Sequence, residues 1–284
     1  MADKAVALKE EGNKRFQAGD YKEAESLYTQ AIQKDPNNPH LFTNRAFTRL
    51  KLASYDPCIT DCLTSISLSP DNMKAYHHLA AAQLALHHPN EALSSALTAY
   101  DLCLASNNAG SAANISALVL QAKKEKWEGR ERERLRRRSG MLTELEDGLR
   151  EIAEREVRGV WEGVGRGEVR AEEAREEEAE VRDRARRKVE ELYRIFAVAD
   201  PANMQRRQVP DYLIDNISFA IMHDPVITPN GQSYDRATIY EHLRRSETDP
   251  LTREPLRRED LRPNLALKQA CEEFLEENGW AVDW

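Results

Sequence analysis

The sequence predicts a mostly α-helical protein with three parts: a superhelical array of helix pairs, a charged helical hairpin and a small α+β domain. Three observations support this. Small residues recur every 34 positions in the first third, and the middle third is rich in Glu and Arg with narrow apolar stripes. The last third carries Asn230-Gly231, a strong hairpin turn signal. We place the domains at residues 1–128, 129–209 and 210–284.

Composition and charge narrow the class of protein. Charged residues make up 32% of the 284 positions, which suits long solvated helices better than one large core. The net charge of -8 argues against general nucleic-acid binding, and the lack of an apolar run of about 18 residues argues against a membrane span. The charged start, MADKAVALKEEGNKRF, argues against an export signal. Four sparse cysteines indicate reduced thiols, and hence a cytoplasmic or nuclear location.

The first third of the chain repeats with a period of 34 residues. Three columns keep this spacing, namely Gly12, Ala46 and Ala80; Ala24, Cys58 and Ala92; and Ala31, Ser65 and Ala99. Pro36 and Pro70 recur with the same step, where a helix must stop. The pattern resembles tetratricopeptide repeats, with units near 5–38, 39–72 and 73–106 and a capping helix over 112–128. This resemblance implies a curved array of antiparallel helix pairs with a concave groove.

Polar residues of the predicted first helices converge on the expected groove. Lys9 and Asn13 are four residues apart and share a helix face, as do Lys74 and His78, while Asn44 lies on the first helix of the second repeat. Lysine supplies positive charge and asparagine supplies directed N–H donors, and this combination suits carboxylates. The alternative is that these are solvated polar residues on a repeat scaffold.

Three motifs of the groove, LKEEGNKRF, FTNRAF and NMKAYHHLA, resemble the carboxylate clamp of chaperone-binding repeat proteins. The resemblance implies that the groove binds the acidic Glu-Glu-Val-Asp tails of heat-shock chaperones. It assigns the clamp itself to Lys9, Asn13, Asn44 and Lys74. It assigns contacts at the rim of the groove to Lys51 and His78. The chain departs from that family at His77, where an aromatic is expected, and at Asn114, where an acid is expected. Both departures bear on peptide register and affinity.

The middle third predicts two amphipathic helices. Apolar residues spaced mainly by three or four positions form two narrow stripes. The first consists of Leu135, Leu142, Leu145, Leu149 and Ile152, and the second of Val181, Ala185, Val189, Leu192 and Phe196. The glycine-rich run GVWEGVGRG at 159–167 breaks the pattern, so we expect a hairpin of helices over 130–158 and 168–199. Such helices gain stability by pairing. We favour a coiled coil that forms a homodimer and so doubles the binding sites; a solvated spacer is the alternative.

The last third predicts a small α+β unit. The run VITPNGQSYDR forms a hairpin, Asp235 caps a helix over about 236–245, and Asn264 caps a final helix. This region resembles the U-box, a RING-like fold, in ISFAIMHDPVITPNGQSYDR, HL, DPLTREPL and PNLALK. RING domains need zinc held by Cys and His, and this unit has too few of both for two such sites. The resemblance implies that hydrogen bonds and ion pairs replace the metals, with these candidates: Asp224, Ser233, Asp235, Arg236 and Glu254.

The same resemblance assigns a docking surface for ubiquitin-conjugating enzymes. Its contacts would be Ile217, Phe219, Met222, Pro250 and Arg253, an apolar patch rimmed by polar groups. For Ile217 and Phe219 the alternative is a place in the core of a small domain. Arg253 would act in catalysis, because its planar fork of donors can bind both the conjugating enzyme and ubiquitin and hold the thioester conjugate closed.

The resemblance to chaperone-associated U-box ubiquitin ligases extends along essentially the whole chain. It implies a RING-type ubiquitin transferase without a catalytic cysteine, since Cys271 lies on the apolar face of the last helix. No metal and no cofactor are expected. The partners would be chaperone tails, conjugating enzymes with ubiquitin, and misfolded client proteins in protein quality control. The alternatives are a non-catalytic co-chaperone adaptor and a ligase for a different acidic-tailed partner.

Overall fold

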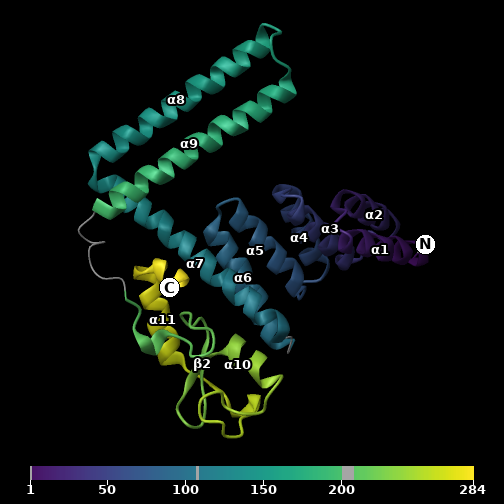
Figure 1. The fold of residues 1–284 in the computed structure, drawn as a ribbon. Coiled ribbons are helices and arrows are strands. Elements are labelled where there is room, and N and C mark those ends of the chain that lie inside the picture. Colours follow the sequence, from purple (N-terminus) through teal and green to yellow (C-terminus); the bar gives the residue numbers. More distant parts are fainter. Residues whose placement is uncertain (1, 107–108, 200–207) are drawn as a thin grey trace. The chain divides into compact units, whose positions relative to one another are not determined.

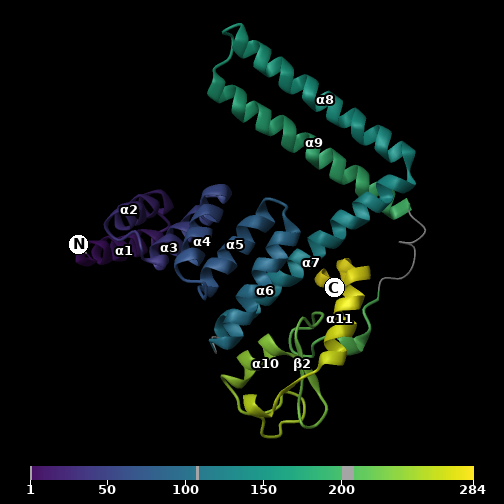
Figure 2. The ribbon, with the colours of Figure 1, turned by 180° about the vertical axis from the view of Figure 1, so that it is seen from behind.

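The computed structural model describes residues 2–106, 109–199 and 208–284 and confirms the mostly helical fold with a small C-terminal sheet (Figures 1 and 2). Residues 1–127 and 209–284 form one compact unit, and residues 128–208 form another. The repeat array and the C-terminal domain therefore belong to the same unit, while the charged middle segment stands by itself.

The repeat array consists of three helix pairs that follow one another along the chain (Figure 1). Their bounds are α1 Ala2–Gln17, α2 Tyr21–Lys34, α3 Pro39–Lys51, α4 Tyr55–Leu68, α5 Met73–Ala85 and α6 Pro89–Ala105. The small-residue columns are buried at the helix contacts, as predicted. At Gly12 a Cβ atom would come within 2.8 Å of the Tyr28 ring, so only glycine fits there.

The turn inside each helix pair also follows the 34-residue period. Gly19, Ala53 and His87 occupy the same place in successive repeats, and all three have positive φ angles of 83°, 55° and 60°. The left-handed conformation reverses the chain just after a helix ends. Asp20, Asn38 and Asn72 then cap α2, α3 and α5 through their side-chain oxygens.

The middle segment forms a helical hairpin whose bounds differ from the prediction. α7 runs as one helix over Ala109–Arg138, beyond the expected capping helix, and the chain breaks at Ser139, whose side chain caps α8, Gly140–Gly165. The glycines at 159–165 remain helical, because glycine weakens a helix by only about 1 kcal/mol without forbidding it. The chain turns instead at Gly167 (φ 74°) into α9, Ala171–Ala199. α8 and α9 lie side by side (Figure 2).

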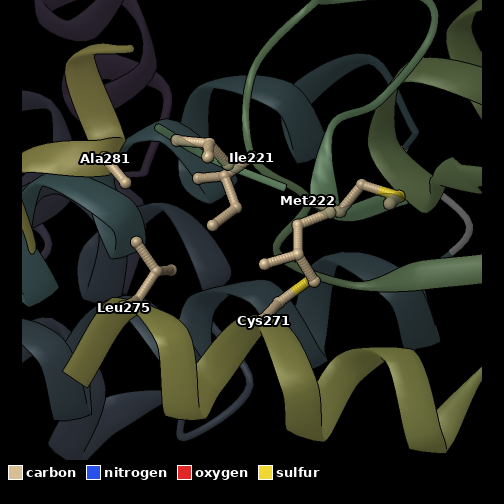
Figure 3. Close-up of a cluster of buried hydrophobic side chains, with 7 residues drawn as sticks. Ile221, Met222, Cys271, Leu275 and Ala281 are labelled. Carbon is tan, nitrogen blue, oxygen red and sulfur yellow. The ribbon is translucent and has the colours of Figure 1, made fainter. Parts of the chain in front are cut away.

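The C-terminal domain is built on a three-stranded antiparallel sheet in the order β2-β1-β3. The strands are β1 Pro225–Ile227, β2 Ser233–Asp235 and β3 Arg262–Pro263, and Val226 pairs with both Tyr234 and Pro263. Two helices follow the predicted caps, α10 over Arg236–Leu243 and α11 over Leu265–Glu277. The apolar face of α11 packs Cys271 and Leu275 against Ile221 and Met222, as Figure 3 shows.

Candidate functional site

Asn13 lies at the centre of a polar contact between α1, α2 and α3 of the repeat array. Its side-chain oxygen accepts hydrogen bonds from the Tyr28 hydroxyl at 2.7 Å and from the Asn44 amide at 3.2 Å. Burial raises the pKa of Tyr28 to about 12, so the hydroxyl remains a donor at neutral pH. With its oxygen engaged by two donors, Asn13 has an oriented amide whose NH₂ end can donate to a ligand.

An aromatic row connects the first helices of the three repeats. Phe16 lies 4.8 Å from Phe47 between ring centroids, and Phe47 stacks on His78 at 4.6 Å. The Lys51 ammonium lies 5.5 Å from the centre of the Phe47 ring, a cation–π contact that holds its charge beside the row. The ring of His77 follows, 5.4 Å from that of His78. This face of the first helices thus combines a row of rings with a cationic side chain.

The structure brings four of the six predicted groove residues into contact in two groups. Asn13 and Asn44 are in direct contact, and Lys51 and His78 meet through Phe47. His78 is only 8% exposed, so it is not the exposed rim contact that was predicted. Burial lowers the pKa of His78 to about 3, and the nearby positive charges of His77, Lys74 and Lys51 act in the same direction.

The two predicted clamp lysines lie one helical turn from these contacts. Lys9 is half-buried on α1, four residues before Asn13, and Lys74 is exposed on α5, four residues before His78. Both lysines thus lie on the first helix of a repeat, one turn before a residue of these contacts, and positive charge near an oriented amide favours a ligand with carboxylates.

The first loop of the C-terminal domain is organised by Asp215, which is fully buried. One carboxylate oxygen accepts from the Ser218 N–H, the Ser218 hydroxyl and the Thr238 hydroxyl at 2.8–2.9 Å, and the other accepts from the Asp235 N–H at 3.0 Å. The Asp215 carbonyl accepts from the Phe219 N–H. Phe219 takes a left-handed conformation (φ 57°), and its side chain is 73% exposed.

The second loop repeats this arrangement around Asp249. One carboxylate oxygen accepts from the Tyr234 hydroxyl and from the N–H groups of Leu251 and Thr252 at 2.8–2.9 Å, while the Asp249 carbonyl accepts from the Arg253 N–H. Burial acts to raise the pKa of Asp249, but these hydrogen bonds outweigh it and hold the pKa below its usual value. Arg253 is also left-handed, with φ 62°.

Both loops therefore end in a strained residue that presents its side chain outward. A non-glycine residue in the left-handed region costs about 1–3 kcal/mol and persists only where the surroundings fix it. In each loop the fixing group is an aspartate four residues earlier. Backbone strain held by a buried carboxylate is typical of a functional surface, and here it sets the direction of Phe219 and Arg253.

The predicted docking residues divide into exposed and buried ones. Phe219 and Arg253 are exposed, Pro250 is half-buried, and Ile217 is partly buried against the domain core. The prediction for Met222 is wrong: it is 1% exposed and packs inside the core, so it cannot contact a partner. Five of the six residues over 217–222 are apolar, and their composition alone does not tell which side chains face inward.

Sequence reasoning missed three residues of this surface. Leu251 is exposed on the second loop, and Asp215 and Asp249 hold the two loops. A signal was present, because DNISF and DPLTR share an Asp followed three positions later by Ser or Thr. Comparing these two segments would have identified both anchors.

A network of ion pairs and hydrogen bonds joins the rest of the domain. Asp224 accepts from Arg236 at 2.5 Å, from Lys268 at 3.4 Å and from the Tyr100 hydroxyl of the repeat array at 3.3 Å. The five predicted network residues all make side-chain bonds, including Asp235 to the His223 and Asp224 N–H groups, Ser233 to Asn264, and Glu254 to Asn230. Burial raises the pKa of Asp235 to about 6.

Two negative findings apply to the described part of the chain. No group of three or more His, Cys, Asp or Glu side chains is arranged to hold a metal ion there, and no helix there is long and apolar enough to cross a membrane.

Burial raises the pKa of Cys271 to about 12, and its side chain is inside the core. This thiol is therefore unsuited to carry a thioester.

Comparison with known families assigns both ends of the chain. The family model described as U-box domain matches residues 209–280, and the model described as tetratricopeptide repeat matches residues 5–38. E3 ubiquitin-protein ligase CHIP of Arabidopsis thaliana is 33% identical over 279 residues, which cover 98% of this chain and 95% of that protein. RNA polymerase II-associated protein 3 of Homo sapiens is 41% identical over 91 residues, covering 32% of this chain and 14% of that protein.

Two solved repeat domains are also similar. The TPR2B domain of yeast Sti1, in a complex with an Hsp70 peptide, is 32% identical and covers 42% of this chain and 95% of that chain, with a TM-score of 0.41. The second TPR domain of human RPAP3, in complex with the HSP70 peptide SGPTIEEVD, is 33% identical and covers 35% of this chain and 82% of that chain, with a TM-score of 0.34.

A tetratricopeptide array followed by a U-box defines a ubiquitin ligase of the RING type with a separate protein-binding module. The chain belongs to the CHIP family of E3 ubiquitin-protein ligases. The predicted class of enzyme, a ubiquitin transferase, is thus confirmed.

Proposed function

We propose that the repeat groove binds the acidic C-terminal tails of heat-shock chaperones, and that the U-box recruits a ubiquitin-loaded conjugating enzyme to modify misfolded clients held by the chaperone. The observation that carries the tail-binding part is the convergence on Asn13, whose amide is oriented by Tyr28 and Asn44. Oriented amide donors between lysines match a peptide that ends in several carboxylates.

The chemical step follows from the two docking loops. Phe219 and Leu251 offer exposed apolar surface to the conjugating enzyme, and Arg253 offers guanidinium donors beside it. A client lysine attacks the thioester carbonyl; a C–N bond replaces the C–S bond, the conjugating enzyme's thiolate leaves, and the lysine nitrogen loses a proton. The ligase contributes by holding the thioester in a reactive geometry.

Binding of a synthetic peptide that ends in Glu-Glu-Val-Asp tests the groove. We expect Lys9→Ala and Lys74→Ala each to weaken binding about tenfold or more, because a charge-assisted hydrogen bond contributes about 1.5–3 kcal/mol. Isothermal titration calorimetry on the full chain measures this, and amidation of the peptide C-terminus should have a similar effect.

The matched control is Lys14→Ala, since Lys14 lies on the same helix but its side chain is 75% exposed beside Glu11. This variant should bind normally. Unchanged affinity in both Lys9→Ala and Lys74→Ala would contradict the clamp. Equal affinity for acidic tails of unrelated sequence would instead favour a different acidic-tailed partner.

The helical hairpin supports a homodimer. Met141, Leu145 and Ile152 are exposed on one face of α8, whereas Leu142 is fully buried within the hairpin against Leu135 and Tyr193. An apolar stripe on a helix otherwise rich in Glu and Arg suits a symmetric contact with a second copy.

The four buried cysteines fit a reducing compartment, so we propose that the protein is located in the cytoplasm or the nucleus.

Charge on this stripe should separate the dimer. We expect the double variant Leu145→Glu with Ile152→Glu to sediment as a monomer, because two buried carboxylates in a C2 interface face their own copies. Glu154→Lys, on another face of α8, should leave the sedimentation coefficient unchanged. A wild-type chain that sediments as a monomer, or a double variant that remains dimeric, would contradict this interface.

A further inference from the structure

Two adjacent histidines on α5 lie among the cations of the peptide groove. His78 stacks on Phe47, which also carries Lys51 at 5.5 Å, and His77 lies 5.4 Å from His78 between ring centroids. Lys74 precedes them by three and four residues and so shares their helix face. A titratable pair is therefore built into the surface that would receive the carboxylates of a bound peptide.

The surroundings of both histidines favour the neutral imidazole. Burial lowers the pKa of His77, and it lowers that of His78 further, with the positive charges of His77, Lys74 and Lys51 adding to the effect. The carboxylates on neighbouring helices are paired elsewhere or exposed. On α4, Asp61 pairs with Arg45 and Arg49, and Asp56 is exposed. On α7, Glu125 lies near His87, and on α6, Glu91 and Asp101 are exposed. The charged groups that act on His78 are thus cationic.

The two histidines differ in how readily they can accept a proton. His78 is the more deeply buried, is pressed flat on Phe47, and has an Nδ1 atom without a hydrogen-bond partner among the described residues. His77 is half-buried, and desolvation is what lowers its pKa. A change in the local charge therefore acts first on His77.

We propose that His77 takes up a proton when an acidic C-terminal peptide fills the groove, so that the peptide binds more tightly as the pH falls toward 6.5. The inference rests on the proposed function of the groove. Peptide carboxylates beside Lys51 and Lys74 would cancel the positive potential around the histidines and add negative charge, which favours imidazolium. By linkage, a ligand that favours the protonated form binds that form better.

The burial of His77 sets the direction of the pH effect. Its pKa in the free protein lies below the usual value, and the bound peptide raises it. Well above the bound-state pKa neither form carries the proton, and affinity does not change with pH. Between the two pKa values affinity rises as the pH falls, by up to about tenfold for each unit of difference, and below the free-state pKa the gain is complete.

Calorimetry in buffers of different ionisation enthalpy measures the proton directly. Full-length protein is titrated with a free-acid peptide ending in Glu-Glu-Val-Asp at about pH 6.5, where the peptide carboxylates, with pKa values near 4, are already ionised. We expect a net uptake of roughly 0.2–0.6 proton for the wild type and none for His77→Gln. His40→Gln, an exposed histidine at the start of α3, should retain the uptake.

The affinity should follow the same pattern. Wild type and His40→Gln should bind about three- to tenfold more tightly near pH 6 than near pH 7.5, and His77→Gln should show a flat profile. Peptide binding without proton uptake in the wild type, or uptake that persists in His77→Gln, overturns this inference alone. No binding at either pH would overturn the clamp itself and this inference with it.

Discussion

Replacing Arg253 with alanine should reduce ubiquitin transfer about 100-fold, the typical cost of removing one donor that stabilises a reacting centre. The side chain is exposed at the end of the Asp249 loop, and its N–H is held by the Asp249 carbonyl at 2.9 Å, so the guanidinium is the part that changes. Discharge of ubiquitin from a loaded conjugating enzyme onto free lysine measures the effect. Binding of the acidic peptide to the repeat groove should not change.

Two companion variants separate the guanidinium from the backbone. Arg253→Gly relieves the left-handed strain at φ 62° but also lacks the donors, so it should be as inactive as Arg253→Ala. Arg245→Ala removes an arginine of the same domain whose side chain is 80% exposed, and it should transfer ubiquitin normally. Full activity in Arg253→Gly would show that the guanidinium has no part in the reaction.

Replacing Asp215 with alanine should unfold the U-box or leave it barely stable. The carboxylate is fully buried and accepts four hydrogen bonds, two from backbone N–H groups and two from hydroxyls. Removing it leaves these donors unsatisfied inside the domain, and each one that finds no new partner costs about 1–3 kcal/mol, a large part of the stability of a small domain. Thermal unfolding and ubiquitin discharge should both show the loss.

The neighbouring aspartate provides the control for this experiment. Asp211 lies in the same segment but is exposed, so Asp211→Ala should have the same melting temperature as the wild type. The melting temperature of Asp215→Asn should lie between those of Asp211→Ala and Asp215→Ala. Asparagine keeps one acceptor oxygen but puts an NH₂ group in place of the other. An Asp215→Ala variant with wild-type melting behaviour would rule out the carboxylate as the anchor of the first loop.

The repeat array was largely predictable because its physics is periodic. Each buried column needs a small residue at the same phase, and the 34-residue step therefore appears directly in the sequence. The turns were harder to predict, since Ala53 and His87 adopt the conformation for which Gly19 is suited. Neither residue type signals a left-handed turn, and only its place in the repeat does.

The hairpin and the U-box show where sequence patterns stop being informative. The glycines between 159 and 165 suggested a break, but Gly163 lets Val169 pack against α8, where a Cβ atom would lie 3.3 Å away. Tertiary contact thus decides whether glycine ends a helix. Likewise, Met222 and Phe219 are both apolar residues of one loop, and only the backbone turn at Phe219 sends one inward and the other outward.

The aspartate anchors of the two loops have a consequence for the conditions under which this ligase can work. A zinc-bound domain loses its fold when thiolate ligands are oxidised or a chelator removes the ion. Here Asp215 and Asp249 hold the two docking loops through oxygen acceptors that neither oxidants nor chelators attack. The U-box should therefore keep its docking surface during oxidative damage, when misfolded proteins accumulate and their removal is most needed.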